Sequence, residues 1–349
     1  MLSVRQAENA KKRVEAAALA AAEAEKNGQP APVVTLPPIP PPESIYTPAK
    51  AAEEMLALLK LDGKDPNAEK PTLIGLARGA FARAMIYQLT RNDSEYARYM
   101  RNIAATYKPD ELGPTILAEV GNFLYNSGEL DKAEPFYRYL MDNYRSAYRA
   151  DSGFAGIGKI CLDRKEFRKA YETFNDALEN GVYGEEELAL RIGRARALIG
   201  LPKADAAQLE ISDPFERALK DLNFVLAVKD WKYAGGHAQA FYYKGQLEEA
   251  RGKPNEAVTY YRNCYLTQGK WKDYAAPAML RAGVLFEEKL GQRDAAAQIY
   301  YEMSQPKHRF AGTDAAKEAA RRALKLPYTP PTETPAAAPA APAGTPAAK

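Results

Sequence analysis

Between residues 72 and 310, small and large apolar side chains recur together at a repeated spacing. Each repeat places a Gly twelve residues before an Ala, with one extra residue in one copy, thirteen extra in another, and Met in place of Gly in a third. The pairs are Gly121 with Ala133, Gly158 with Ala170, Gly245 with Ala257, Gly283 with Ala296, Gly193 with Ala218, and Met85 with Ala97. Large apolar residues stand at Phe81, Leu117, Phe154, Phe241 and Met279, and at Tyr137, Phe174, Leu222, Tyr261 and Tyr300.

This pattern predicts pairs of α-helices that pack closely on one another. The Gly in the first helix and the Ala in the second remove side-chain bulk, so the two backbones approach and their crossing angle is fixed. The large residues fill the remaining space and supply most of the packing energy. Turns rich in Gly and Pro, such as Ser127–Leu130 and Gly252–Asn255, separate the helices. Such a pair cannot bury its apolar face alone, so the pairs must stack.

The sequence around and within this array changes composition sharply. Helix-forming residues with a thin apolar stripe, proline runs and a Pro/Ala-rich end each predict a different state. The predicted segments are an Ala/Glu/Lys-rich helix (1–28), a Pro-rich linker (29–46), a short N-terminal helix covering the open end of the array (47–63), an insertion in the fourth pair (202–214), a C-terminal capping helix (311–326) and a disordered tail (327–349).

The paired Gly and Ala positions resemble the tetratricopeptide repeat family, over about residues 78 to 310 in six units. The stretch Ile116–Glu179 is the most typical. The resemblance implies an all-α fold, a right-handed α-solenoid of antiparallel helix pairs with flanking disordered segments. Slightly long units are similar to those of bacterial envelope and assembly-factor members. The resemblance also implies a non-enzymatic scaffold or adaptor that holds a peptide or extended partner segment in a concave groove lined by the first helices.

The residue after each Gly is expected to face that groove. These positions hold Ile86, Asn122, Lys159, Arg194, Gln246 and Val284. Asn side chains can hold a backbone amide, and Lys or Arg suit carboxylates, so a protein or peptide ligand with acidic groups is the expected partner. The predicted groove residues are Asn122, Tyr125, Asn126, Lys159, Arg194, Tyr242 and Gln246. The chaperone-tail carboxylate clamp is matched only in part, because Ala118 stands where that clamp has Lys.

Charge and reactive residues give no support to chemistry or to nucleic-acid binding. The net charge is +3, with 48 Lys and Arg against 45 Asp and Glu, so there is no strong basic field for phosphates. The two His residues are far apart, and Gly153, Gly156 and Gly158 lie inside a predicted helix as packing glycines. Cys161 and Cys264 fall on apolar positions and are expected to be small buried thiols. We therefore predict no enzyme, no catalytic residue, no cofactor and no metal.

The first residues contain no unbroken apolar core of a targeting signal, and no stretch approaches the roughly 20 apolar residues of a membrane span. As written, the sequence predicts a cytoplasmic protein, or a periplasmic one if a signal precedes Met1. The alternative function is a structural subunit of a larger assembly, in the bacterial cell envelope, that uses the convex face and the N-terminal helix.

Overall fold

The computed structural model describes residues 73–182, 184, 186–229 and 234–328, and all regular elements in these residues are helices. The predicted segments 1–28, 29–46 and 47–63, and the tail beyond Tyr328, lie outside the described residues. The elements are α3 (Leu73–Leu89), α4 (Asp93–Thr106), the 3-10 helix η2 (Pro109–Glu111), α5 (Pro114–Asn126), α6 (Leu130–Asn143), α7 (Ala150–Asp163), α8 (Phe167–Glu179), α9 (Glu187–Gly200), α10 (Lys203–Gln208), α11 (Pro214–Ala227), α12 (Ala234–Ala250), α13 (Pro254–Thr267), α14 (Lys272–Glu288), α15 (Arg293–Ser304) and α16 (Asp314–Lys325).

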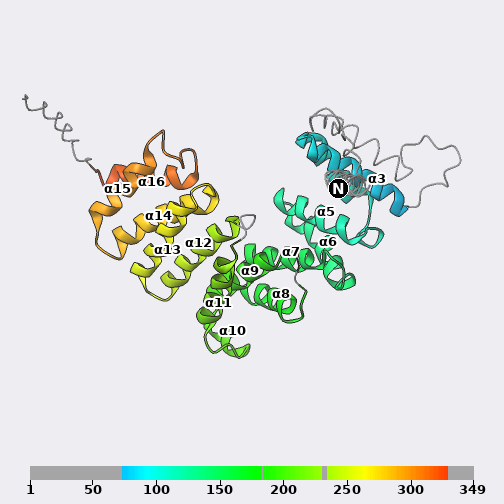
Figure 1. Ribbon diagram of the computed structural model, residues 1–349, viewed down its shortest axis with the longest axis horizontal. Coiled ribbons are helices and arrows are strands. Elements are labelled where there is room, and N and C mark those ends of the chain that lie inside the picture. The colour runs from blue at the N-terminus through cyan, green and yellow to red at the C-terminus, as the bar shows by residue number, and fades with distance from the viewer. Residues whose placement is uncertain (1–72, 183, 185, 230–233, 329–349) are drawn as a thin grey trace, which may run out of the picture.

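The helices form successive hairpins that stack into a curved array. The hairpins are α3 with α4, α5 with α6, α7 with α8, α9 with α11, α12 with α13, and α14 with α15. Figure 1 shows them following an arc, with α5, α7, α9 and α12 on its inner side and α6, α8, α11 and α13 on its outer side. The predicted all-α solenoid of helix pairs is therefore confirmed, and α16 packs against α14 and α15 at its C-terminal end.

The glycines of the first helices lie against aromatic rings of the second helices. A Cβ atom added at Gly121 would stand 2.7 Å from Cε1 of Tyr137, and one added at Gly156 would stand 2.5 Å from the same ring. Gly121 is in the same hairpin as Tyr137, whereas Gly156 is in the next one. Phe174 is held in the same way between Gly158 and Gly193. Each of these rings thus packs between two neighbouring hairpins, and glycine is required at these positions because a side chain would collide with the ring.

The turns inside the hairpins use residues with a left-handed backbone. Gly128, Gly252 and Gly291 have positive φ angles in the turns after α5, α12 and α14. Lys165 (φ 60°) has the same conformation after α7, where a side chain makes it less favourable. The positive φ ends one helix and reverses the chain before the next begins.

The insertion in the fourth hairpin is partly helical. Residues Lys203–Gln208 form the short helix α10, whose Ala206 is buried. The chain then turns at Glu210, which has a φ of 55°. Asp213 accepts a hydrogen bond from the backbone N–H of Glu216 at 2.9 Å and thereby caps α11. The insertion thus leads directly into the second helix of the hairpin.

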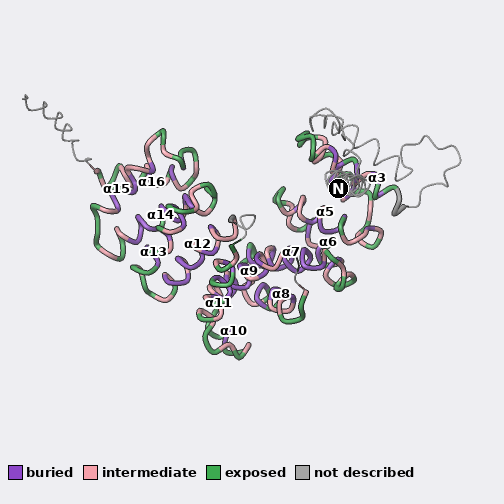
Figure 2. Tube along the Cα trace, in the orientation of Figure 1, coloured by how far each residue is buried: buried purple, intermediate pink, exposed green. Residues whose placement is uncertain are grey.

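Buried residues lie along the facing sides of the helices, and exposed residues gather in the turns and on α10 (Figure 2). Alanines at the repeat positions, including Ala133, Ala170 and Ala257, have no exposed surface. Both cysteines are free and buried, as predicted from their positions. Burial raises the pKa of the Cys264 thiol to about 12.

Candidate functional site

The inner side of the array holds a groove of 1090 Å³, here called the concave groove. Its walls come from α3, α4, α5, α7, α9, α12 and α14, so the first helices supply most of the surface. Polar and aromatic side chains dominate it. The groove is therefore a surface built jointly by several hairpins, and no single hairpin contains it.

Four of the predicted residues, Asn122, Tyr125, Asn126 and Lys159, line this groove together. The Oδ1 atom of Asn122 accepts a hydrogen bond from the hydroxyl of the buried Tyr137 at 2.7 Å, which orients its amide group. Its N–H groups make no hydrogen bond to any described residue, so they can donate to another acceptor. The Tyr125 hydroxyl donates to Asp163 at 2.6 Å. Burial, together with this hydrogen bond, raises the pKa of Tyr125, which keeps it a neutral donor.

Two cations, Lys159 on α7 and Arg196 on α9, lie in the middle of the groove. Both are half-buried, and neither forms an ion pair with a carboxylate anywhere in the described part of the chain. The Arg196 guanidinium stands 5.0 Å from the ring centre of Tyr243 on α12. Burial raises the pKa of Tyr125 and of Tyr274, and the nearby positive charge of Arg196 partly opposes this rise. Arg196 is thus surrounded by phenol groups from three different helices.

Arg194 does not lie in the groove, contrary to the sequence-based expectation. Its side chain is only 7% exposed and forms two hydrogen bonds of 2.8 Å with the buried carboxylate of Asp221 on α11. Its Nη1 atom also donates to Asn175 on α8 at 2.9 Å. Arg194 and Arg196 are two residues apart on one helix, so they point to nearly opposite sides. The buried Asp221 draws Arg194 away from the groove.

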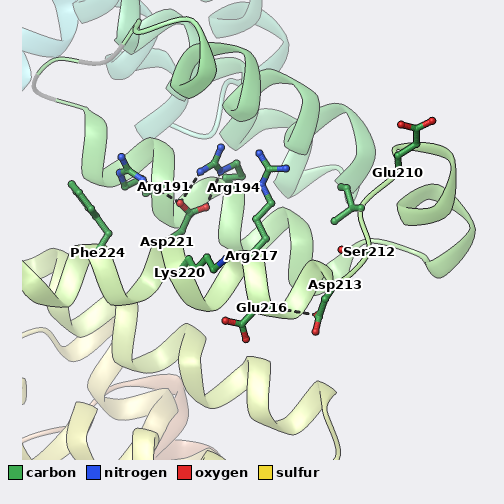
Figure 3. A pocket seen from close by; sticks show the side chains of 11 residues that line it. Arg191, Arg194, Glu210, Ser212, Asp213, Glu216, Arg217, Lys220, Asp221 and Phe224 are labelled. Carbon is green, nitrogen blue, oxygen red and sulfur yellow. Dashed lines mark hydrogen bonds and ion pairs between the residues drawn. The ribbon is translucent and has the colours of Figure 1, made fainter.

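Arg194 belongs instead to a second cleft, of 590 Å³, between α9, the insertion and α11. Figure 3 shows the guanidinium groups of Arg191 and Arg194 beside Asp221. Arg191 also pairs with Glu187 at 2.8 Å, and Arg217 pairs with Glu179 at 2.8 Å. Each of these arginines is paired with a carboxylate. The charged residues around this cleft therefore form an ion-pair network that joins α8, α9 and α11.

The other predicted positions also lie outside the lining of the concave groove. Ile86 is 9% exposed and Val284 is 6% exposed, so both are packed into the protein. Gln246 donates a hydrogen bond to the hydroxyl of Tyr242 at 3.1 Å, and the Tyr242 ring packs edge-on against Tyr243 and Tyr274. Through this contact Tyr242 supports Tyr274, which itself lines the groove.

Several groove residues were missed in the sequence, among them Arg196, Tyr96, Phe123, Gln239 and Tyr274. For α9, a helical spacing of three or four residues links Ala189, Ile192 and Arg196 on one face, and that face lines the groove. This spacing was visible in the sequence. The rule of one residue after each Gly was too rigid, because on α9 that position, Arg194, faces the buried Asp221 of α11.

The end of the groove near α4 and α5 has a different chemistry from its middle. The rings of Tyr96 and Phe123 are half-buried and meet edge-on with centres 5.6 Å apart. Asp93 and Glu119 line the groove beside them, and Glu119 pairs with Arg149 at 2.8 Å. This end is therefore aromatic and acidic, whereas the middle is cationic.

The described residues offer no group of three His, Cys, Asp or Glu side chains that could hold a metal ion. In the same part of the chain, no helix has the length and apolar character required to cross a membrane. The arrangement of the groove is suited to holding a partner by hydrogen bonds, ring contacts and charge.

Comparison with solved structures finds a tetratricopeptide repeat protein from Parabacteroides merdae ATCC 43184. The similarity covers 80% of this chain and 91% of that chain, at 16% sequence identity and a TM-score of 0.45. No family model matches the sequence, and no curated protein matches it. The hairpin pairing and the glycine–aromatic contacts described above define the chain as a tetratricopeptide-like helical solenoid.

Proposed function

We propose that this protein is a non-enzymatic scaffold that captures an extended, acidic segment of another protein in the concave groove. The observation that carries the proposal is the pair of half-buried cations, Lys159 and Arg196, without a carboxylate partner in the described residues. A charge withdrawn from water is costly unless it is paired. A carboxylate supplied by a partner would remove that cost and gain charge-assisted hydrogen bonds.

The polar side chains around the cations support an extended peptide as the ligand. Asn122, Asn126 and Gln239 line the groove from α5 and α12, and each amide can both donate to and accept from a peptide backbone. The phenol groups of Tyr125 and Tyr274 add rigid contact area of the kind that is common at binding hot spots. Together these groups can bind the main chain, while the cations select acidic side chains.

Charge reversal tests the proposal. Fluorescence anisotropy would measure binding of three labelled peptide pools, in which otherwise identical random sequences carry Glu, Gln or Lys at the charged positions. We expect the Glu pool to bind best, with an affinity that falls as salt is added. The variant Arg196→Glu should weaken its binding by about tenfold or more, because an attractive pair becomes a repulsive one.

Lys220 provides a matched control for this experiment. It is an exposed lysine on α11, outside the concave groove, so Lys220→Glu makes the same type of charge change at another place. We expect this variant to bind the Glu pool like the unchanged protein. Equal binding of the Glu and Gln pools, or an equal loss in Lys220→Glu and Arg196→Glu, would contradict the proposal.

A further inference from the structure

We infer that the bound segment carries one apolar or aromatic anchor, with acidic residues about three and about six positions away on one side of it. This inference rests on the proposed function and names the sequence pattern of the partner. It follows from the order of the surfaces along the groove. An aromatic surface on α4 and α5 comes first, then Lys159 on α7, then Arg196 on α9.

The anchor site is the surface formed by Tyr96, Ala97 and Phe123. All three residues are half-buried and line the groove. Arg101 stands 5.4 Å from the ring centre of Phe123 and, with the edge contact from Tyr96, holds this ring in place. When an apolar side chain covers a fixed aromatic surface that is still partly open to solvent, the burial of that surface favours binding.

Charge gives acidic residues of the ligand no gain at this end of the groove. Asp93 lies beside the anchor site and would repel them, and Glu119 already forms an ion pair with Arg149. In the described part of the chain, the helices α5, α7 and α9 contribute two cations to the groove, Lys159 and Arg196. Acidic residues must therefore lie to one side of the anchor, which gives the ligand a polarity.

The spacing follows from helix packing. Neighbouring packed helices lie about 8–10 Å apart, and an extended peptide advances about 3.3 Å per residue. One step from α5 to α7 therefore corresponds to about three residues, and two steps to α9 correspond to about six. A Phe on the anchor site places a Glu three positions away at Lys159 and a Glu six positions away at Arg196.

The test uses synthetic peptides and the full chain. One labelled peptide has Phe, then Glu at the third and sixth following positions, with Gly, Ser and Gln elsewhere. A second has the same composition, but both Glu residues directly follow Phe. Both peptides are made in the two chain directions, because the spacing applies to either. Anisotropy should show about tenfold tighter binding of the spaced peptide in one direction.

A double-mutant cycle then tests which cation meets which acid. Replacing the Glu at the sixth position by Gln should cancel the effect of Arg196→Gln, while leaving the effect of Lys159→Gln unchanged. The Glu at the third position should show the opposite pairing. Replacing the peptide Phe by Ser should weaken binding to every variant by a similar factor. Urea midpoints measured for each variant show whether it is folded.

The possible failures are distinct. If both spacings bind equally and Arg196→Glu still weakens both, the groove is an acidic-peptide site but the spacing is wrong. If the couplings do not separate between the two cations, the assignment of the acids is overturned. If neither peptide binds, and Glu-rich pools bind no better than Gln-rich ones, the proposed function fails as well.

Discussion

The substitution Gly156→Ala tests the packing that joins neighbouring hairpins. The added methyl group would stand 2.5 Å from three carbon atoms of the Tyr137 ring, well inside van der Waals contact. The ring cannot move aside, because the backbone of α5 at Gly121 lies against it on another side and its hydroxyl is bonded to Asn122. Tyr137 is only 1% exposed. The strain must therefore be taken up by the helices themselves.

The size of the effect follows from two opposing contributions. Overpacking a core costs about 1–3 kcal/mol, whereas Gly→Ala inside a helix gains about 1 kcal/mol in intrinsic propensity. We expect a net loss of up to about 2 kcal/mol in the free energy of unfolding. For an array of this size, this lowers the melting temperature by up to about 4–8 °C. Urea unfolding followed by far-UV circular dichroism would measure it.

Two further variants make the result specific. At Gly236 in α12 an added Cβ would meet its nearest neighbour, Val225, at an ordinary 3.5 Å, so Gly236→Ala should stabilise by up to about 1 kcal/mol. Tyr137→Leu should cancel the penalty at Gly156, since Leu222 fills the corresponding place in α11. If Gly156→Ala raised the unfolding midpoint as Gly236→Ala does, our account of the ring contact would be refuted.

Three other predictions concern buried or partly buried polar groups. Arg194→Met should destabilise by about 1.5–3 kcal/mol, because the buried Asp221 loses its two 2.8 Å hydrogen bonds and keeps only the longer contact with Arg191 at 3.4 Å. Arg194→Met combined with Asp221→Leu should recover much of this loss in the same urea assay, and a negligible effect of the single variant would contradict the assigned pairing. Burial raises the pKa of Cys264 to about 12, so a thiol reagent at neutral pH should label this residue only after urea is added. Fast labelling of the native protein would contradict this, because it would show that the helices around Cys264 open without denaturant. Burial lowers the pKa of His308 below its ordinary 6.5, so the stabilisation by this residue is complete above pH 6.5 and is lost as the pH falls below that value. The melting temperatures of His308→Gln and the unchanged protein should therefore differ at neutral pH and converge on acidification. A difference that stays constant with pH would contradict this.

The sequence was sufficient for the fold because its signals are local and repeated. The pairing of Gly121 with Ala133 is repeated at equivalent positions along the chain, and a glycine such as Gly121 or Gly158 is needed where a ring of the second helix reaches the backbone of the first. The side chains that face the groove could be predicted only in part. Arg194 and Arg196 are both arginines on the same helix, and their opposite roles depend on the buried Asp221 of α11.

The groove also depends on distances that exceed a single repeat. Tyr125 on α5 and Tyr274 on α14 line the same surface, although almost half of the chain separates them. Their meeting depends on the accumulated curvature of the intervening hairpins. A pattern of apolar positions fixes each hairpin, but it does not fix the sum of the small rotations between them.

The rings of Tyr137 and Phe174 each contact two neighbouring hairpins. A truncated protein that ends after α8 would therefore uncover one side of Phe174, and the same holds for Tyr137 in a fragment that ends after α6. Fragments that end at these junctions would expose an aromatic ring and would aggregate when expressed. Soluble pieces of this chain would need a polar residue in place of the uncovered ring.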